Sequence, residues 1–112
     1  MKLVKESEGR VFSPPLHSGV TSREIVSKDT PAQNVAFHLS TIAPGSGSDL
    51  DSHPVSEQIF YVMSGQVTFR TEGAELVARA GETVFIAAGE PHATLNEGEV
   101  DAVCLVVTAP PT

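Results

Sequence analysis

Two histidines and one aspartate in this 112-residue sequence have the types and the spacing of metal ligands. Asp51 and His53 are separated by one residue, so on a β-strand their side chains point to the same face. His92 comes later in the chain, directly after the turn-forming residues 89–91. Imidazole and carboxylate groups bind borderline divalent metals well. A β-barrel whose neighbouring strands point these side chains into one cavity therefore provides a metal site.

Short apolar segments make up most of the chain and predict an all-β fold. Apolar residues recur mostly at every second position or in short runs, and Gly, Pro or Asn clusters interrupt them about every ten residues. The pair Ser64-Gly65 supplies one hairpin turn, since glycine accepts the positive φ of a tight turn. The expected strands are residues 22–27, 35–43, 59–63, 66–71, 75–78, 83–86, 92–96 and 100–107. Because closure removes exposed sheet edges, this pattern predicts a barrel.

The chain length suits one domain with one hydrophobic core. Residues 1–21 contain Pro14-Pro15 and have weak periodicity, which predicts an N-terminal arm. Residues 22–108 form the expected barrel, and residues 109–112 form a short tail.

Charge and composition exclude several classes of partner. The formal net charge is −7, with only seven Lys plus Arg, which argues against binding to nucleic acid or to an anionic membrane. No apolar run of membrane-spanning length is present, and Cys104 has no second cysteine with which to form an intrachain disulfide. These features predict a soluble cytoplasmic protein.

The sequence resembles the cupin superfamily in the residue types and spacing of two motifs. The family's first motif is Gly, five residues, His-x-His, three or four residues, Glu, six residues, Gly. Here Gly45 is followed after five residues by Asp51-Ser52-His53, after four by Gln58 and after six by Gly65. The second motif is Gly, five residues, Pro-x-Gly, two residues, His, three residues, Asn. It corresponds to Gly81, Ala87-Ala88-Gly89, His92 and Asn96, with Ala87 in place of proline.

The resemblance implies a double-stranded β-helix, or jelly-roll, barrel made of a single cupin domain. It places Asp51, His53, Gln58 and His92 in the four metal-ligand positions. Asp51 stands where the family has histidine, and Gln58 stands where it has glutamate, which lowers the expected affinity. Glu57 is an alternative to Gln58, because a one-residue bulge in the strand would turn its carboxylate inward.

The resemblance also implies a metal-dependent protein that acts on a small organic molecule. Two histidines and a carboxylate are typical of non-haem Fe(II) chemistry, so Fe(II) is the first choice of metal, followed by manganese, nickel and zinc. The expected activity is that of a dioxygenase or of an isomerase or decarboxylase. The alternative is a non-catalytic cupin that binds or senses a small ligand with a weakened or lost metal site. Members of the family commonly form homodimers by exchanging N-terminal strands or by packing sheet on sheet, so a homodimer is expected, with the arm at residues 11–21 as a candidate for exchange.

Four further residues have more than one interpretation. His17 lies in the Pro-rich arm and is expected to be solvated. His38 lies either in the cavity or on the outer face of the sheet, with the outer face favoured. Arg70 either binds a substrate carboxylate or, as favoured, lies on an exposed strand face. Cys104 is expected to be a small buried apolar group without a catalytic role.

Overall fold

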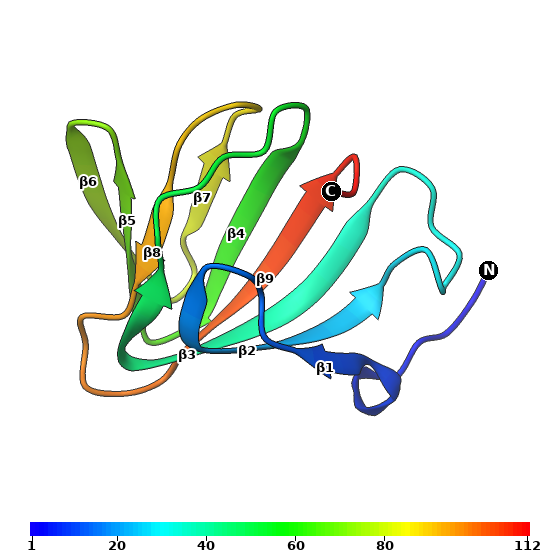
Figure 1. The fold of residues 1–112 in the computed structure, drawn as a ribbon. Helices are drawn as coiled ribbons and strands as arrows, with labels where there is room; N and C mark the ends of the chain where they lie inside the picture. Colours follow the sequence, from blue (N-terminus) through cyan, green and yellow to red (C-terminus); the bar gives the residue numbers. More distant parts are fainter.

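The computed structural model describes all 112 residues and contains nine β-strands and one short 3-10 helix (Figure 1). The elements are η1 (Glu6–Glu8), β1 (Arg10–Phe12), β2 (His17–Val26), β3 (Ala36–Ser48), β4 (Glu57–Ser64), β5 (Gln66–Thr71), β6 (Ala74–Arg79), β7 (Thr83–Ile86), β8 (Ala93–Leu95) and β9 (Ala102–Ala109). The all-β fold expected from the sequence is confirmed. None of its helical segments has the length and hydrophobicity needed to cross a membrane.

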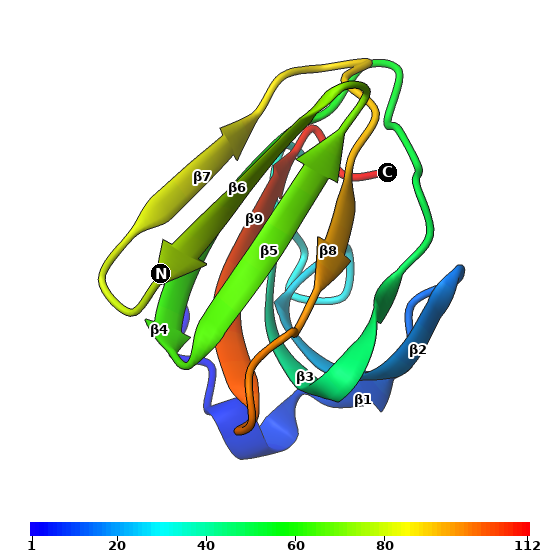
Figure 2. The same cartoon turned by 90° about the vertical axis from the view of Figure 1, so that its left-hand side faces the viewer.

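All nine strands belong to one sheet that curves into a nearly closed barrel. The strand order is β6-β5-β8-β3-β9-β4-β7, and β2 pairs with β3 while β1 pairs with β2. Figure 1 shows β1 and β2 at one end of the curved sheet and β5 and β6 at the other. In Figure 2, β5 and β8 lie in front of β3 and β9, so two layers enclose the interior. The predicted jelly-roll barrel is therefore confirmed.

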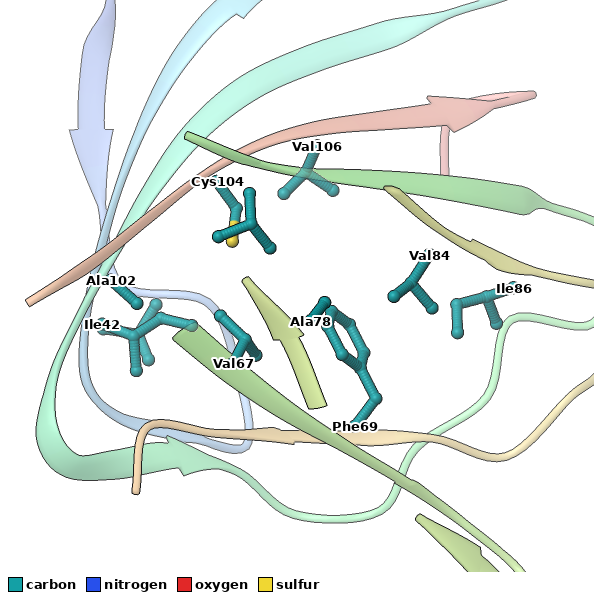
Figure 3. Packing of buried hydrophobic residues seen from close by; sticks show 11 residues of the cluster. Ile42, Val67, Phe69, Ala78, Val84, Ile86, Ala102, Cys104 and Val106 are labelled. Carbon is teal, nitrogen blue, oxygen red and sulfur yellow. The ribbon is translucent and has the colours of Figure 1, made fainter. Parts of the chain in front are cut away.

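The core consists mainly of aliphatic side chains from both layers, together with Phe69 and Cys104. Strand β9 shows the period of two that a half-buried strand requires, since Ala102, Cys104, Val106 and Thr108 are buried and the residues between them are not. Val67 and Phe69 of β5 point from the opposite layer toward Cys104 and Val106 (Figure 3). The full cluster is Val20, Ile42, Val62, Val67, Phe69, Ala78, Val84, Ile86, Ala102, Cys104 and Val106.

Two of the motif residues serve the fold rather than the chemistry. Asn96 is completely buried, and its Nδ2 donates hydrogen bonds of 2.8 Å to the carbonyls of Ile42 and Val100. Its Oδ1 accepts a bond of 2.9 Å from the amide of Gly98, so all of its polar groups are used to join β8 to β3 and to the following loop. Gly65 has a φ of +74°, and a Cβ atom there would lie 2.6 Å from the carbonyl oxygen of Asp101. Only glycine fits this turn.

The N-terminal residues are part of the sheet. Strand β1 was not expected from the sequence, and it pairs Arg10 with Glu24 and Phe12 with Ser22. Strand β2 begins at His17, so residues 17–21, which the sequence assigns to the arm, are hydrogen-bonded to β3. At the other terminus, β9 ends at Ala109, the first residue of the predicted tail. Whether the arm behaves as a separate or an exchangeable segment stays a prediction.

Candidate functional site

A cavity of about 300 Å³ lies inside the barrel. This volume is at the lower end of the range for small-molecule sites, which indicates a small ligand. The cavity is lined by the four predicted ligand residues Asp51, His53, Gln58 and His92, and by the two remaining histidines, His17 and His38. All four histidines of the chain therefore line one cavity.

His53 and His92 come together because two distant segments are joined by backbone hydrogen bonds. The amide of Asp51 donates to the carbonyl of His92 at 2.9 Å, and the amide of His92 donates to the carbonyl of Asp51 at 2.8 Å. The amide of Gly89 donates to the carbonyl of His53 at 2.7 Å. These bonds hold the loop before β4 against the start of β8. The two imidazole rings lie with centroids 5.5 Å apart.

The tautomer of His92 is fixed by its neighbour. Its Nδ1 lies 2.9 Å from the carbonyl oxygen of Glu90, which can only accept, so Nδ1 carries the proton. The lone pair is then on Nε2. Hydrogen bonding of the other ring nitrogen to a backbone carbonyl is the usual support of a metal-binding histidine. The side chain is buried, and its ring centroid lies 6.3 Å from that of Phe60.

Gln58 contributes an amide oxygen without a hydrogen-bond partner. Its Nε2 donates to Oγ1 of Thr108 at 3.0 Å, and its buried Oε1 is the one fully buried side-chain polar atom in the protein that is unpaired. Such an atom costs about 1–3 kcal/mol unless something binds it, so it indicates a function. Glu57 is exposed on the opposite face of β4. No bulge brings it inward, because Glu57 and Gln58 pair in unbroken register with β9.

Asp51 is placed differently from the three other predicted ligands. It is exposed, and its Oδ1 accepts a hydrogen bond of 2.8 Å from the amide of Ser52. The structure contains no group of three or more His, Cys, Asp or Glu side chains positioned to hold a metal ion. The donors that line the same cavity are two imidazoles and the Gln58 oxygen, groups that suit a weakly held divalent ion. The role of the four residues as ligands stays a prediction.

Burial and the neighbouring His92 favour the neutral form of His53 by lowering its pKa. Loss of solvation lowers its pKa, and the nearby His92 lowers the pKa further. The negative charge of Asp51 raises the pKa of His53, and His17 makes a smaller contribution that lowers it. The net effect is a lowered pKa. Since only the neutral imidazole binds a metal ion, this environment prepares His53 as a ligand at neutral pH.

His38 of β3 and His17, the first residue of β2, also line the cavity. The structure places His38 in the cavity, so the outer-face interpretation that the sequence favoured is wrong. Burial lowers the pKa of His38 to about 4, with a smaller contribution from His17. The ring of Phe12 meets His38 edge to face at 5.8 Å. His17 is half-buried rather than solvated, and its Nδ1 lies 2.7 Å from the carbonyl of Pro15.

Arg70 and Cys104 have the roles that the sequence favoured. Arg70 lies outside the main cavity, and its guanidinium pairs with Glu75 at 2.6 Å and with Glu97 at 3.4 Å. Cys104 is buried, and burial raises the pKa of its thiol to about 11, so it is not a nucleophile at neutral pH. The arginine that does line the cavity is Arg10, on the strand that the sequence did not predict.

The match to a known family agrees with this fold and cavity. The Cupin domain family model matches residues 38–108, which is well over half of the chain, and the chain therefore belongs to the cupin family. It is 32% identical over 71 residues to the oxalate-binding protein of Thermotoga maritima, covering 63% of this chain. It is 26% identical over 92 residues to the tetracenomycin polyketide synthase protein TcmJ of Streptomyces glaucescens, covering 80% of this chain.

Solved structures show the same barrel. A predicted oxalate decarboxylase from Thermotoga maritima has a TM-score of 0.82 and 24% identity, with 98% of this chain and 100% of that chain covered. At this identity, the likeness concerns the fold alone. The present chain spans 59% of the length of the oxalate-binding protein and 61% of that of TcmJ.

Proposed function

We propose that this chain is a metal-dependent cupin that acts on a small organic molecule in the barrel cavity, as a mononuclear metal enzyme of the dioxygenase or the isomerase or decarboxylase type. The observation that carries the proposal is the His53–His92 pair, with ring centroids 5.5 Å apart, in the same cavity as the unpaired Oε1 of Gln58. The name of the oxalate-binding relative supports a small oxygen-rich ligand.

His53, His92 and Gln58 would hold the ion, and Asp51 would join them if its carboxylate leaves the amide of Ser52. Fe(II) is the first choice of metal, followed by manganese, nickel and zinc. A divalent ion bound there supplies a Lewis acid for an oxygen of the organic molecule. The chain itself orients His92 through Glu90 and lines the cavity with apolar side chains such as Phe60 and Val106, which exclude water.

Metal analysis tests this proposal directly. Protein purified without a chelator and then reconstituted with Fe(II) or Mn(II) is expected to approach one ion per chain, because the donor set favours a single site. Plasma emission spectrometry after gel filtration measures the ratio. A content below about a tenth of an ion per chain after reconstitution with either metal would rule out the metal-dependent enzyme.

The second candidate is a non-catalytic cupin that binds or senses a small ligand. It is favoured by the hydrogen bond that holds the Asp51 carboxylate on Ser52 and by the lack of a third acidic, histidine or cysteine ligand. Saturable ligand binding without turnover by fully reconstituted protein would support this candidate. Turnover that depends on the added metal would support the enzyme.

We also propose that two copies of the chain pack together through the outer face of the sheet. This outer face is formed by the outward side chains of β3, β9, β4 and β7: Phe37, Leu39, Thr41, Val103, Leu105, Val107, Ala109, Glu57, Ile59, Tyr61, Met63, Thr83 and Phe85. Strand β9 is apolar on both faces, which is typical of a strand that is covered on both sides. Glu57 is the one charged residue of the set, so the net charge of the chain lies elsewhere.

Phe85→Glu is expected to convert the dimer into a monomer. Phe85 is 56% exposed in the single chain, so glutamate there is compatible with folding but would place a charge in the apolar interface. Multi-angle light scattering at micromolar concentration should give twice the 11.8 kDa chain mass for the wild type and the chain mass for the variant. Val100→Glu is the matched control, since Val100 is 65% exposed and outside this face. A monomeric wild type would contradict the proposal.

A further inference from the structure

Besides the His53–His92 pair, the cavity has a second polar region, which is built by the N-terminal strands and the adjoining part of β3. We call it the arm cluster. Its members come from β1 and β2 and from the facing part of β3: Arg10, Phe12, His17, Glu24 and His38. Among the seven Lys and Arg residues of the chain, Arg10 alone lines this cavity.

The side chain of Arg10 is 64% exposed at the edge of the cavity, and its guanidinium is only partly engaged. Its Nε donates to Oε2 of Glu24 at 3.2 Å, and its central carbon lies 5.0 Å from the centre of the Phe12 ring. The two terminal nitrogens make no hydrogen bond within the protein. A planar guanidinium with two free terminal nitrogens presents the fork of donors that binds a carboxylate in a bidentate manner.

A continuous row of side chains leads from the arm cluster to the His53–His92 pair. On neighbouring strands, His38 pairs with Val106, and Val106 pairs with Phe60. Arg10 belongs to the same row, because it pairs with Glu24 and Glu24 pairs with His38. Two strand spacings, about 10 Å, therefore separate Arg10 from His38, and two more separate His38 from Phe60. Phe60 in turn meets His92 edge to face. A small ligand bound at the Arg10 end has a charged donor at one end and points along the row toward the apolar side chains.

We infer that the cavity takes a small carboxylic acid whose carboxylate is bound by Arg10, with the rest of the molecule directed into the cavity along this row toward Val106. The inference rests on the proposed function, because it identifies the class of small molecule that this cavity takes. The neutral imidazole of His38 adds an uncharged hydrogen-bonding group two strands from Arg10 in the same row. The acidic excess of the chain does not extend here, where Glu24 and Asp51 are the acidic side chains in the lining.

Glu24 then has a defined part in recognition. In the free protein, its carboxylate occupies one donor of Arg10 and competes with an incoming acid. Glu24→Gln keeps an oxygen acceptor for the Arg10 Nε and removes the negative charge. Substitution of Arg10 should therefore weaken acid binding, and substitution of Glu24 should strengthen it. If the ion pair were only structural, the two substitutions would not have opposite effects on acid binding.

Matched acids and amides provide the test: acetate and acetamide, butyrate and butyramide, and benzoate and benzamide. Chemical-shift titrations of the chelator-treated protein, repeated after loading with Zn(II), measure each Kd. Arg10→Gln should raise the Kd of the best acid about tenfold and leave that of its amide unchanged. Glu24→Gln should lower the Kd of the same acid roughly two- to fivefold. Arg70→Gln is the matched control, an arginine that pairs with glutamates outside the cavity.

The outcomes separate this inference from the proposed function. If the zinc content is normal but Arg10→Gln and Arg70→Gln bind the acids equally well, the inference is wrong and the metal-dependent function stands. If acid binding depends on Arg10 but no metal is retained, the inference stands and the metal-dependent function falls. If no acid of the series shifts a cavity resonance in either form of the wild type, the inference is wrong.

Discussion

Replacement of both His53 and His92 with alanine is expected to abolish binding of divalent metal ions while leaving the barrel folded. Loss of a single supporting group around a metal typically costs 10–100-fold in affinity, so loss of two ligands should cost more than about 100-fold. Each single variant should fall between the double variant and the wild type. Calorimetric titration with Mn(II) or Zn(II) measures the affinity, and circular dichroism with thermal unfolding reports on the fold.

The barrel should survive because neither histidine belongs to its hydrophobic core. His53 lies in the loop before β4 and is half-buried. Removal of His92 leaves the Glu90 carbonyl without one partner, which costs about 1–3 kcal/mol. Unfolding of the double variant would mean that the pair is structural. Metal affinity equal to that of the wild type would mean that the site lies elsewhere.

The sequence predicts the barrel well because two independent signals agree in it. The period of two in the apolar residues defines where strands lie, and β5 and β7 have the expected bounds. The motif spacing adds residues whose roles are geometric, as the fully satisfied Asn96 and the positive φ of Gly65 show. Strand β1 is missed because three residues are too few to show a period.

The site is less predictable because it depends on where individual side chains turn. Strand parity places Gln58 inward, as in the structure, but no pattern reveals that its Oε1 is left unpaired. The sequence is compatible with two roles for Asp51, as a metal ligand or as an acceptor for a nearby backbone amide. Only the side-chain rotamer distinguishes the two roles. His38 shows a further limit, since β3 carries apolar residues on both faces and its pattern does not say which face is inside.

Gln58→Glu is expected to strengthen metal binding, because it restores a carboxylate at the position where the cavity now offers a neutral amide oxygen. A charged oxygen is a stronger ligand than an amide, and the affinity for Mn(II) or Fe(II) should rise roughly tenfold or more. Thr108 remains in place to hydrogen-bond the new side chain, now as a donor. Binding raises stability by mass action, so the metal-induced increase in Tm should also exceed that of the wild type.

Glu57→Gln is the matched control for this experiment. Glu57 is the neighbouring residue and lies on the exposed face of β4. The substitution is the reverse of Gln58→Glu, because it replaces a carboxylate with an amide. It should leave metal affinity and the metal-induced shift in Tm unchanged. Equal affinities in Gln58→Glu, Glu57→Gln and the wild type would remove Gln58 from the ligand set. The unpaired Oε1 would then be explained by the organic ligand, because a buried acceptor in this cavity still needs a donor, and a small molecule with a hydroxyl or amide group supplies one.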